Sequence, residues 1–411
     1  MTRRHPPASG SPPASGPRRL AVVLSHPTQY YSPWFAYLAA HTPLTLRVFY
    51  LWDAGVTARR DPQFGTTFAW DRDLLAGYEQ EFVPNRATDP GSDHFGGLNN
   101  PTLVARLRGW QPDAVLVFGY NYRTHVRLIL GARWPLIFRG DSHLIDHPPP
   151  RLVKRWLLRA LFARFAAITF VGQANRDYFR AFGVPESRLH FAPHCVDESH
   201  FTATPAILAE STALRTRLGI GDRRVVLFAG KFVPAKQPLP LLRAFLALAP
   251  ADAALVFVGQ GEELPALQAA AAARPDLTVR FLPFANQSEM PARYLLADIF
   301  ALPSRGLSET WGLAVNEAMH LGVPCLVSTH VGCQRDLVTD GKTGWVFKAA
   351  DPAALASTLA RALADIARPS SAIRAAVGRR SAGYTYVRAA DGLMHAVASV
   401  LGPRKPASAT P

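Results

Sequence analysis

Short apolar segments alternate with longer helical patterns along nearly the whole chain, and this alternation restricts the possible folds more than any other feature. Such apolar segments are typical of strands in parallel sheets that helices cover on both faces. Strict alternation of strand and helix predicts a doubly wound α/β fold. The first series of expected strands comprises residues 20–25, 44–51, 114–119, 135–140 and 166–172, and the second comprises residues 224–230, 253–259, 277–284, 299–304 and 324–328.

The two series predict two Rossmann-like domains that face each other across a cleft. A chain of 411 residues suits two domains at roughly 100–200 residues each. We expect a first domain over residues 18–200, a second over residues 201–375, and a helical segment over residues 376–402 that returns to the first domain. Residues 1–17 and 403–411 have little to bury and are expected to be disordered tails. The clearest helices are expected at residues 151–165, 238–249, 262–273, 288–297 and 312–321.

Charge and cysteine content limit the partners and the compartment. The formal net charge of +15 predicts attraction to an anion, such as a phosphate ligand, an acidic membrane surface or nucleic acid. The three cysteines, Cys195, Cys325 and Cys333, show no metal-site spacing and are an odd number for a disulfide framework. A reducing cytoplasm therefore fits best. No apolar segment reaches the ~20 residues that span a membrane, so we expect a cytoplasmic protein that is soluble or peripheral at the membrane.

The segment ETWGLAVNE, residues 309–317, places two carboxylates on either side of an expected helix start near Gly312. Ligands of doubly wound sheets bind at the carboxyl ends of the strands, so this segment is expected to lie at the cleft. The free N–H groups of a helix start suit an anion, and carboxylates accept hydrogen bonds from ring hydroxyls. Glu309 and Glu317 could therefore bind two polyol parts of one ligand with a phosphate between them. The alternative is that Glu309 is only a helix N-terminal charge and that Glu317 is solvated.

Two other loops of the second domain follow expected strands. The segment FAGKFVPAKQP, residues 228–238, contains Lys231 and Lys236, which could donate to phosphates at the cleft or be solvated surface residues. Only six lysines occur in the chain, and two of them lie here, which favours the functional interpretation. In the segment FVGQGEEL, Gly259 permits close approach of a ligand or forms an ordinary turn.

Two loops of the first domain could complete the cleft. The segment FRGDSHLIDH ends a strand and contains Asp141 and His143. A histidine there could donate to a phosphate or to a hydroxyl near the reacting carbon, although a lone histidine is more often structural. The first strand–helix loop, SHPTQYYSP, contains His26 and Tyr30, and we interpret it as an acceptor-side loop or a turn. No dinucleotide fingerprint follows the first strand, which argues against a nicotinamide enzyme, and we find neither a Walker loop nor a zinc cluster.

The basic segment RLVKRWLLRALFAR, residues 151–164, contains five basic residues and no acidic one. Such a helix could lie on an anionic membrane surface. A helix between two buried strands would more commonly pack one face inward and expose a solvated face.

Taken together, these segments resemble the retaining glycosyltransferases of family 4, which have the GT-B fold. Residues 306–347 resemble the long second-domain signature of that family, and its Glu-seven-residues-Glu motif falls on Glu309 and Glu317. The segments AGKFVPAKQ, VGQGEEL and LADIFALPS are similar to the neighbouring family segments. APHCVDESHF resembles the domain-linking segment, with His194 and Cys195 in place of Asn and Gly. The resemblance covers most of residues 20–400.

The resemblance implies a role for each donor-side residue. Lys231 and Lys236 would bind the donor diphosphate. Glu317 would hold the ribose hydroxyls, and Glu309 would contact the hydroxyls of the donor sugar. The backbone of Trp311 would lie close to them, as would that of Gly312.

The resemblance also places one first-domain residue beside the reacting carbon, and either His143 or Asp141 could take that place. The nucleotide base would lie around Gly259, Pro283 and Phe284. The sequence differs from the family pattern in the linker and in the first strand–helix loop. Both differences concern the acceptor side more than the donor side.

The implied activity is metal-independent transfer of a glycosyl group, with retention of configuration, from a UDP-, GDP- or ADP-sugar to a glycan or lipid-linked acceptor. No cofactor is expected. The opening loop is similar to that of a subgroup associated with cell-surface polysaccharide assembly. A GT-B-type sugar-nucleotide epimerase and a non-catalytic polysaccharide-assembly protein are the alternatives. Nucleic-acid binding, which the charge alone permits, fits poorly with an intact acidic pair.

Overall fold

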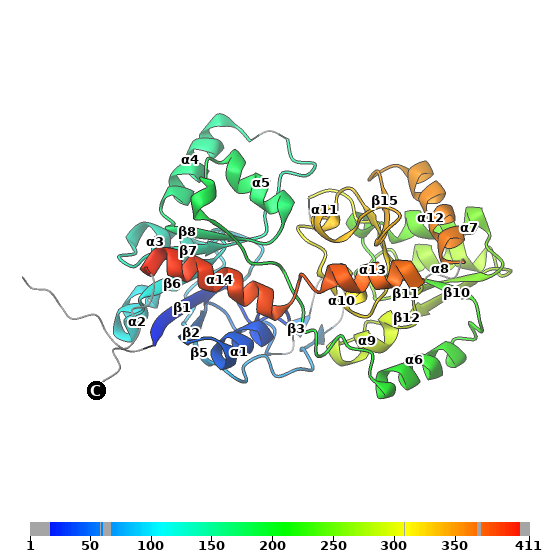
Figure 1. Ribbon diagram of the computed structural model, residues 1–411, viewed down its shortest axis with the longest axis horizontal. Helices are drawn as coiled ribbons and strands as arrows, with labels where there is room; N and C mark the ends of the chain where they lie inside the picture. The colour runs from blue at the N-terminus through cyan, green and yellow to red at the C-terminus, as the bar shows by residue number, and fades with distance from the viewer. Residues whose placement is uncertain are drawn as a thin grey trace, which may run out of the picture.

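The structure is a computed structural model that describes residues 17–57, 59, 60, 67–148, 150–307, 309–367 and 371–402. It contains two parallel sheets, each flanked by helices (Figure 1). The expected fold class, two doubly wound α/β domains, is therefore confirmed. Apart from Pro17, the two expected tails lie outside the described residues.

The first sheet has the strand order β5-β2-β1-β6-β7-β8-β9, and all of its pairings are parallel. A small antiparallel pair, β3 with β4, stands apart from it. The strands are β1 (Arg18–Leu24), β2 (Leu44–Tyr50), β3 (Arg59–Arg60), β4 (Thr67–Phe68), β5 (Glu79–Phe82), β6 (Ala114–Phe118), β7 (Leu136–Arg139), β8 (Ala167–Phe170) and β9 (Leu189–Phe191). The helices are α1 (Ser32–His41), α2 (Leu103–Trp110), α3 (Arg123–Gly131), α4 (Leu152–Ala163) and α5 (Gln173–Ala181).

The second sheet has the order β12-β11-β10-β13-β14-β15 and is also parallel. Its strands are β10 (Arg224–Ala229), β11 (Ala253–Val258), β12 (Thr278–Leu282), β13 (Ile299–Leu302), β14 (Cys325–Ser328) and β15 (Gly344–Phe347). Its helices are α6 (Pro205–Arg217), α7 (Pro238–Leu248), α8 (Leu264–Ala272), α9 (Met290–Tyr294), α10 (Leu313–His320), α11 (Gln334–Leu337), α12 (Pro352–Ile366) and α13 (Ser371–Ser381).

All of the expected strands and helices are present, with small shifts at their ends. The strands that the apolar pattern missed include β5, β9 and β15, which are all edge strands. An edge strand has one strand neighbour and a more exposed backbone, so it needs no continuous apolar run. The segment EQEF of β5 is partly exposed throughout, which hides it from a search for apolar segments.

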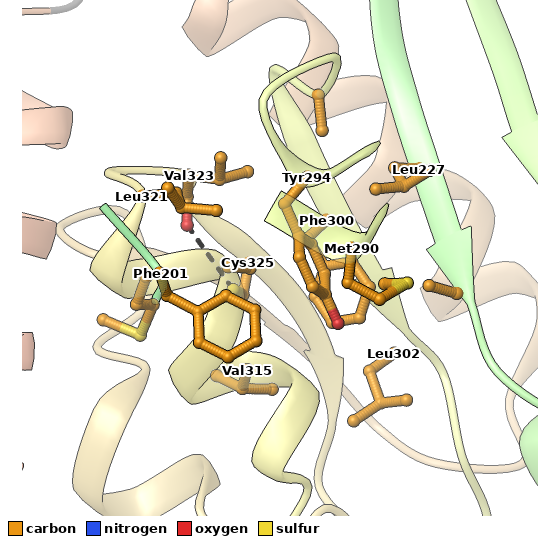
Figure 2. Close-up of a cluster of buried hydrophobic side chains, with 14 of the residues drawn as sticks. Phe201, Leu227, Met290, Tyr294, Phe300, Leu302, Val315, Leu321, Val323 and Cys325 are labelled. Atoms are coloured by element: carbon orange, nitrogen blue, oxygen red, sulfur yellow. Dashed lines mark hydrogen bonds between the residues drawn. The ribbon is translucent and has the colours of Figure 1, made fainter. Parts of the chain in front are cut away.

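One core of the second domain lies between the sheet and helices α9 and α10 (Figure 2). Leu227 of β10, Phe300 of β13 and Val315 of α10 are all fully buried in it. Burying each such side chain contributes roughly 1.5–3 kcal/mol. Tyr294 also belongs to this cluster, and its hydroxyl donates to the carboxylate of Glu317 at 2.6 Å. The core therefore positions a polar group at the functional site.

The chain returns to the first domain at its end. Helix α14 (Tyr386–Leu401) packs against β8 and β9 and contributes Ala389, Leu393 and Ala396 to the first-domain core (Figure 1). A Cβ at Gly392 would lie 1.9 Å from the carbonyl oxygen of Phe191, so only glycine allows this close approach.

The linker between the domains is held from both sides. The fully buried guanidinium of Arg139, at the end of β7, donates to the carbonyl oxygens of Ala192 at 2.9 Å and Pro193 at 3.2 Å. From the second domain, the amide of Asn316 donates to the carbonyl oxygen of His194 at 3.2 Å. Buried polar groups need such partners, so these bonds fix the path of the linker.

No helix within the described residues is long and apolar enough to cross a membrane. The three cysteines are all buried and free.

Candidate active site

A cavity of about 440 Å³ lies between the two domains at the carboxyl ends of both sheets. We call it the central cavity. The cavity is lined by the β10–α7, β11–α8 and β12–α9 loops, by the start of α10 and by three first-domain loops. Of the site residues expected from the sequence, it brings together Tyr30, Asp141, Lys231, Lys236, Gly259, Glu309, Trp311, Gly312 and Glu317.

Glu309 is buried in the β13–α10 loop, and its carboxylate is held by two groups of its own domain. The ammonium of Lys236 forms an ion pair with it, and the hydroxyl of Ser304 donates to it at 2.8 Å. The carboxylate is thus oriented within the wall of the central cavity.

Glu317 lies in the second turn of α10 and is 3% exposed. Its Oε2 accepts from Tyr294, whereas its Oε1 is buried and has no partner among the described residues. Burial raises the pKa of this carboxyl to about 7, and the neighbouring hydroxyls of Tyr294 and Tyr30 oppose part of that shift. A buried oxygen without a donor is costly, so this atom is available to accept a hydrogen bond within the cavity.

Lys231 and Lys236 follow β10 and both line the central cavity, so the loop brings two ammonium groups to one wall. The neighbouring loop packs tightly against it. Gly259 has a φ of +142°, and a Cβ there would lie 2.0 Å from the carbonyl oxygen of Gly230. Glycine at this position therefore keeps the β10–α7 and β11–α8 loops in contact, whereas the sequence analysis offered close approach of a ligand or an ordinary turn.

The start of α10 faces the cavity. Gly312 precedes it with a φ of +98°, and Leu313 and Ala314 of its first turn line the cavity. The unpaired N–H groups of such a turn favour a negatively charged ligand. The indole of Trp311 is 3% exposed and donates to Asn316 at 2.8 Å, so its side chain is part of the packing and its backbone borders the site.

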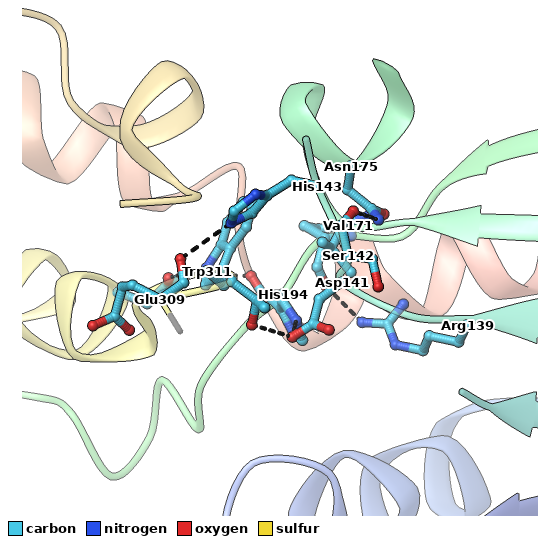
Figure 3. A network of polar contacts seen from close by, with 12 residues as sticks. Arg139, Asp141, Ser142, His143, Val171, Asn175, His194, Glu309 and Trp311 are labelled. Carbon is cyan, nitrogen blue, oxygen red and sulfur yellow. Dashed lines mark hydrogen bonds and ion pairs between the residues drawn. The ribbon is translucent and has the colours of Figure 1, made fainter. Parts of the chain in front are cut away.

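The structure places Asp141 and His143 differently (Figure 3). Asp141 lines the central cavity, and its carboxylate accepts from Thr310 at 2.8 Å and lies 3.6 Å from Nε2 of His194. Burial raises the pKa of Asp141, but the neighbouring His194 ring and the hydrogen bond from Thr310 outweigh it and bring the pKa to about 2. Asp141 is therefore an anion in the cavity.

His143 does not line the central cavity within the described residues. Its Nδ1 accepts from the N–H of Ile145 at 3.2 Å, and its Nε2 lies 3.4 Å from the backbone oxygen of Glu309 (Figure 3). Burial is the main cause that lowers its pKa, which keeps the ring neutral with both nitrogens directed at backbone groups.

The two candidate residues of the first strand–helix loop also differ in whether they line the cavity. Tyr30 lines the cavity and packs against the second-domain core. His26 lies outside the cavity lining, with its Nδ1 3.0 Å from the Ser25 hydroxyl and its ring edge against Trp52.

Sequence reasoning missed three polar partners of the site, namely Tyr294, Ser304 and Thr310. Each residue either lies apart in sequence from the group that it orients, or belongs to a segment that the sequence analysis assigned only as a strand or a helix. No local signal marks them, because the role of each depends on the side chain that it meets in the folded chain. Among the described residues, no group of three or more His, Cys, Asp or Glu side chains could hold a metal ion.

Two Rossmann-like domains with a carboxylate-lined cavity between them define a GT-B architecture. Two family models match the chain: "Glycosyl transferases group 1" over residues 210–378 and "Glycosyl transferase 4-like domain" over residues 56–195. Together they cover most of the chain. The protein belongs to glycosyltransferase family 4.

Curated relatives agree with this assignment. The chain is 34% identical over 304 residues to a D-inositol 3-phosphate glycosyltransferase of Frankia alni, covering 68% of this chain and 72% of the relative. It is 34% identical over 230 residues to a GDP-mannose-dependent α-(1-6)-phosphatidylinositol monomannoside mannosyltransferase of Mycolicibacterium smegmatis, covering 53% of this chain and 58% of the relative. The chain thus spans little more than half the length of that relative and about half of several others.

Solved structures share the fold. The crystal structure of Anabaena HepE in complex with UDP superposes with a TM-score of 0.69 and 18% identity, covering 93% of this chain and all of that one.

Proposed function

We propose that this protein transfers a glycosyl group, with retention of configuration, from a nucleoside diphosphate sugar to a hydroxyl of a glycan or lipid-linked acceptor. The observation that carries the proposal is the arrangement of Glu309 and Glu317. Both line one cavity, each is held by different partners, and two lysines and a helix start lie along the same wall.

The ribose would occupy the end of the cavity at Glu317. A cis-diol offers two donors, and a carboxylate oxygen without a protein partner offers acceptor positions for them. Tyr294 orients the other oxygen from the core side. Binding of a diol would favour the ionised form of this carboxyl and so oppose the effect of burial on its pKa.

The diphosphate would lie against Lys231, Lys236 and the first turn of α10. Negative charge grows on the leaving diphosphate as the bond to the sugar breaks. Fixed ammonium groups and helix N–H groups are already directed at that position, so they stabilise the transition state more than the ground state. In this proposal these groups supply the positive charge, and no metal or cofactor takes part.

The donor sugar would then reach Glu309 on one side and Asp141 on the other. Glu309 would accept hydrogen bonds from sugar hydroxyls while keeping its ion pair to Lys236, which couples the sugar site to the phosphate site. Asp141, unlike His143, lines the cavity, and an anion there would stabilise positive charge that develops on the reacting carbon.

Retention requires that the acceptor hydroxyl attack from the face that the diphosphate leaves. The acceptor oxygen forms the new bond to the sugar carbon, the carbon–phosphate oxygen bond breaks with its electron pair, and the departing phosphate oxygen takes the acceptor proton. The products are a glycosidic bond and a nucleoside diphosphate.

Two classes of acceptor follow from the relatives. The curated relatives are named for inositol phosphate and phosphatidylinositol mannoside, and one of them for GDP-mannose, whereas HepE was crystallised with UDP. We infer that the acceptor is a polyol or a glycolipid used to build the cell envelope. A lipid-linked acceptor would place the protein at the cytoplasmic face of a membrane.

The test is thermal stability of the purified chain against UDP, GDP, ADP and their sugars, with the Glu317→Ala variant alongside. A ligand well above its dissociation constant raises the melting temperature. One nucleotide should raise it selectively, and the variant should lose the effect. No shift with any nucleotide would contradict the proposal and favour a non-catalytic assembly protein. Turnover of the donor to its epimer without an acceptor would instead favour an epimerase.

A further inference from the structure

Helix α4 exposes an apolar face to the surroundings. Leu152 is 73% exposed, Val153 71%, Trp156 70% and Leu157 65%. On a helix with 100° between residues, these four fall within one continuous sector. Leu158 and Phe162, on the opposite sector, are buried against the first-domain core. The helix is thus apolar on both its inner and its outer face.

This finding differs from the sequence expectation of a solvated outer face. A typical surface helix has one apolar stripe, which it buries. Isolated exposed apolar residues need no explanation, but four on one helix face form a patch, and such patches mark interaction sites. At the other end of the helix, Nε of Arg164 donates to the carbonyl oxygen of Ile129 at 3.3 Å, next to the exposed Leu130.

Basic side chains border the exposed apolar face. Arg151, Lys154, Arg155, Arg159 and Arg164 are all exposed, and no acidic residue occurs between positions 151 and 164. None of the five forms an ion pair with any residue that the structure describes. Long basic side chains beside an apolar face can reach anionic headgroups while the apolar groups enter the boundary of the acyl chains.

We propose that α4 docks the protein on an anionic lipid bilayer, with Leu152, Val153, Trp156 and Leu157 entering the interface. A second copy of the chain fits less well, because pairing two such faces would bring ten uncompensated basic residues together, five from each copy. Anionic headgroups satisfy the same charges. An amphipathic helix with a basic border binds such surfaces through apolar burial and charge attraction together.

The position of α4 connects this surface with the central cavity. Asp141, in the cavity, and Leu152, at the start of α4, lie on the same β7–α4 connection. Figure 1 shows α4 at the outer side of the first domain, next to α5. Docking through α4 would therefore hold the acceptor-side domain against the membrane. Docking itself does not depend on the transfer chemistry.

The experiment is co-sedimentation of the full chain with vesicles of phosphatidylcholine alone and of an equimolar mixture with phosphatidylglycerol. We expect binding to the mixed vesicles that weakens with salt. The pair Trp156→Ser and Leu157→Ser should lower the partition coefficient by about tenfold or more, because two large apolar side chains no longer leave water. The pair Lys154→Gln and Arg155→Gln should lower it by roughly fivefold for each charge removed.

Leu208→Ser on α6 is the matched control, because Leu208 is a similarly exposed leucine, at 46%, on another helix. It should bind vesicles as the unmodified protein does. Binding that is independent of phosphatidylglycerol, or unchanged in both α4 pairs, would overturn the proposal. A concentration-dependent dimer in sedimentation velocity that the α4 pairs abolish would assign the face to a second copy instead.

Nucleotide-induced stabilisation, measured on the same proteins, separates the two proposals. Vesicle binding without any nucleotide effect would leave the docking surface standing and refute the proposed transferase. A nucleotide effect without vesicle binding would support the proposed transferase and refute the docking surface.

Discussion

Replacing Glu317 with glutamine should stabilise the ligand-free protein at alkaline pH. The carboxyl is 3% exposed, and burial raises its pKa from 4.5 to about 7. In the unfolded chain the same group ionises near its ordinary value. Between these two values the folded protein binds a proton that the unfolded chain has released, so the free energy of unfolding falls as pH rises. Glutamine keeps the shape and the hydrogen bond to Tyr294 without the charge.

The size of the effect follows from the shift. Each pKa unit corresponds to 1.36 kcal/mol. Glu317 should cost the folded state about 3 kcal/mol at pH 8, about half of that at pH 5.5 and almost nothing at pH 4. The Glu317→Gln variant should therefore melt at a higher temperature than the unmodified protein at pH 8, and the difference should shrink steadily toward pH 4.

The assay is thermal unfolding of both proteins across that pH range without nucleotide, followed by the same series with UDP and GDP. Glu262→Gln is the control, because Glu262 is exposed on a neighbouring loop and does not line the central cavity. The glutamine variant should gain stability and lose nucleotide-induced stabilisation, a trade between stability and function. A Glu317→Gln variant that melts no higher at pH 8 than the unmodified protein would refute the reasoning that this carboxyl is desolvated.

Further substitutions test the other assignments. Glu309→Gln should lower kcat by ~10²-fold or more while nucleotide-induced stabilisation persists, because the sugar contact acts mainly in the transition state. Lys231→Met should weaken binding of a nucleoside diphosphate by about tenfold or more in calorimetry and leave binding of the nucleoside nearly unchanged. Asp141→Asn should lower kcat more than His143→Gln does. The opposite order would mean that His143, and not Asp141, lies beside the reacting carbon. Gly259→Ala should lower the melting temperature and weaken nucleotide binding together, since its Cβ would lie 2.0 Å from a backbone oxygen.

Much of the fold was predictable because it follows from local chemistry. Central strands of a parallel sheet are buried on both faces, so β1, β6, β10 and β11 read as apolar runs in the sequence. Edge strands have no such requirement, and the polar, partly exposed β5 could not be found in the same way. The second-domain wall of the central cavity was predictable for a related reason. Its groups lie on two short segments whose spacing is fixed by a strand end and a helix start.

The first-domain wall of the central cavity depended on tertiary structure. Asp141 and His143 are two residues apart, and their sequence gives no reason to prefer either. Thr310 and the linker residue His194 turn the Asp141 carboxylate to the cavity, whereas the backbone of Glu309 engages the ring of His143. These partners come from positions far along the chain, so no local pattern could reveal them.

The sequence by itself determined the two α/β domains and placed two carboxylates and two lysines at one cleft, because apolar periodicity and motif spacing act over a few residues. Only the tertiary structure decided which atoms face the central cavity, which oxygen of Glu317 lacks a partner, and which face of α4 points outward. Burial and hydrogen-bond satisfaction are properties of groups that meet from distant positions. For that reason the pKa of Glu317 and the exposed apolar face of α4 exist only in the folded chain.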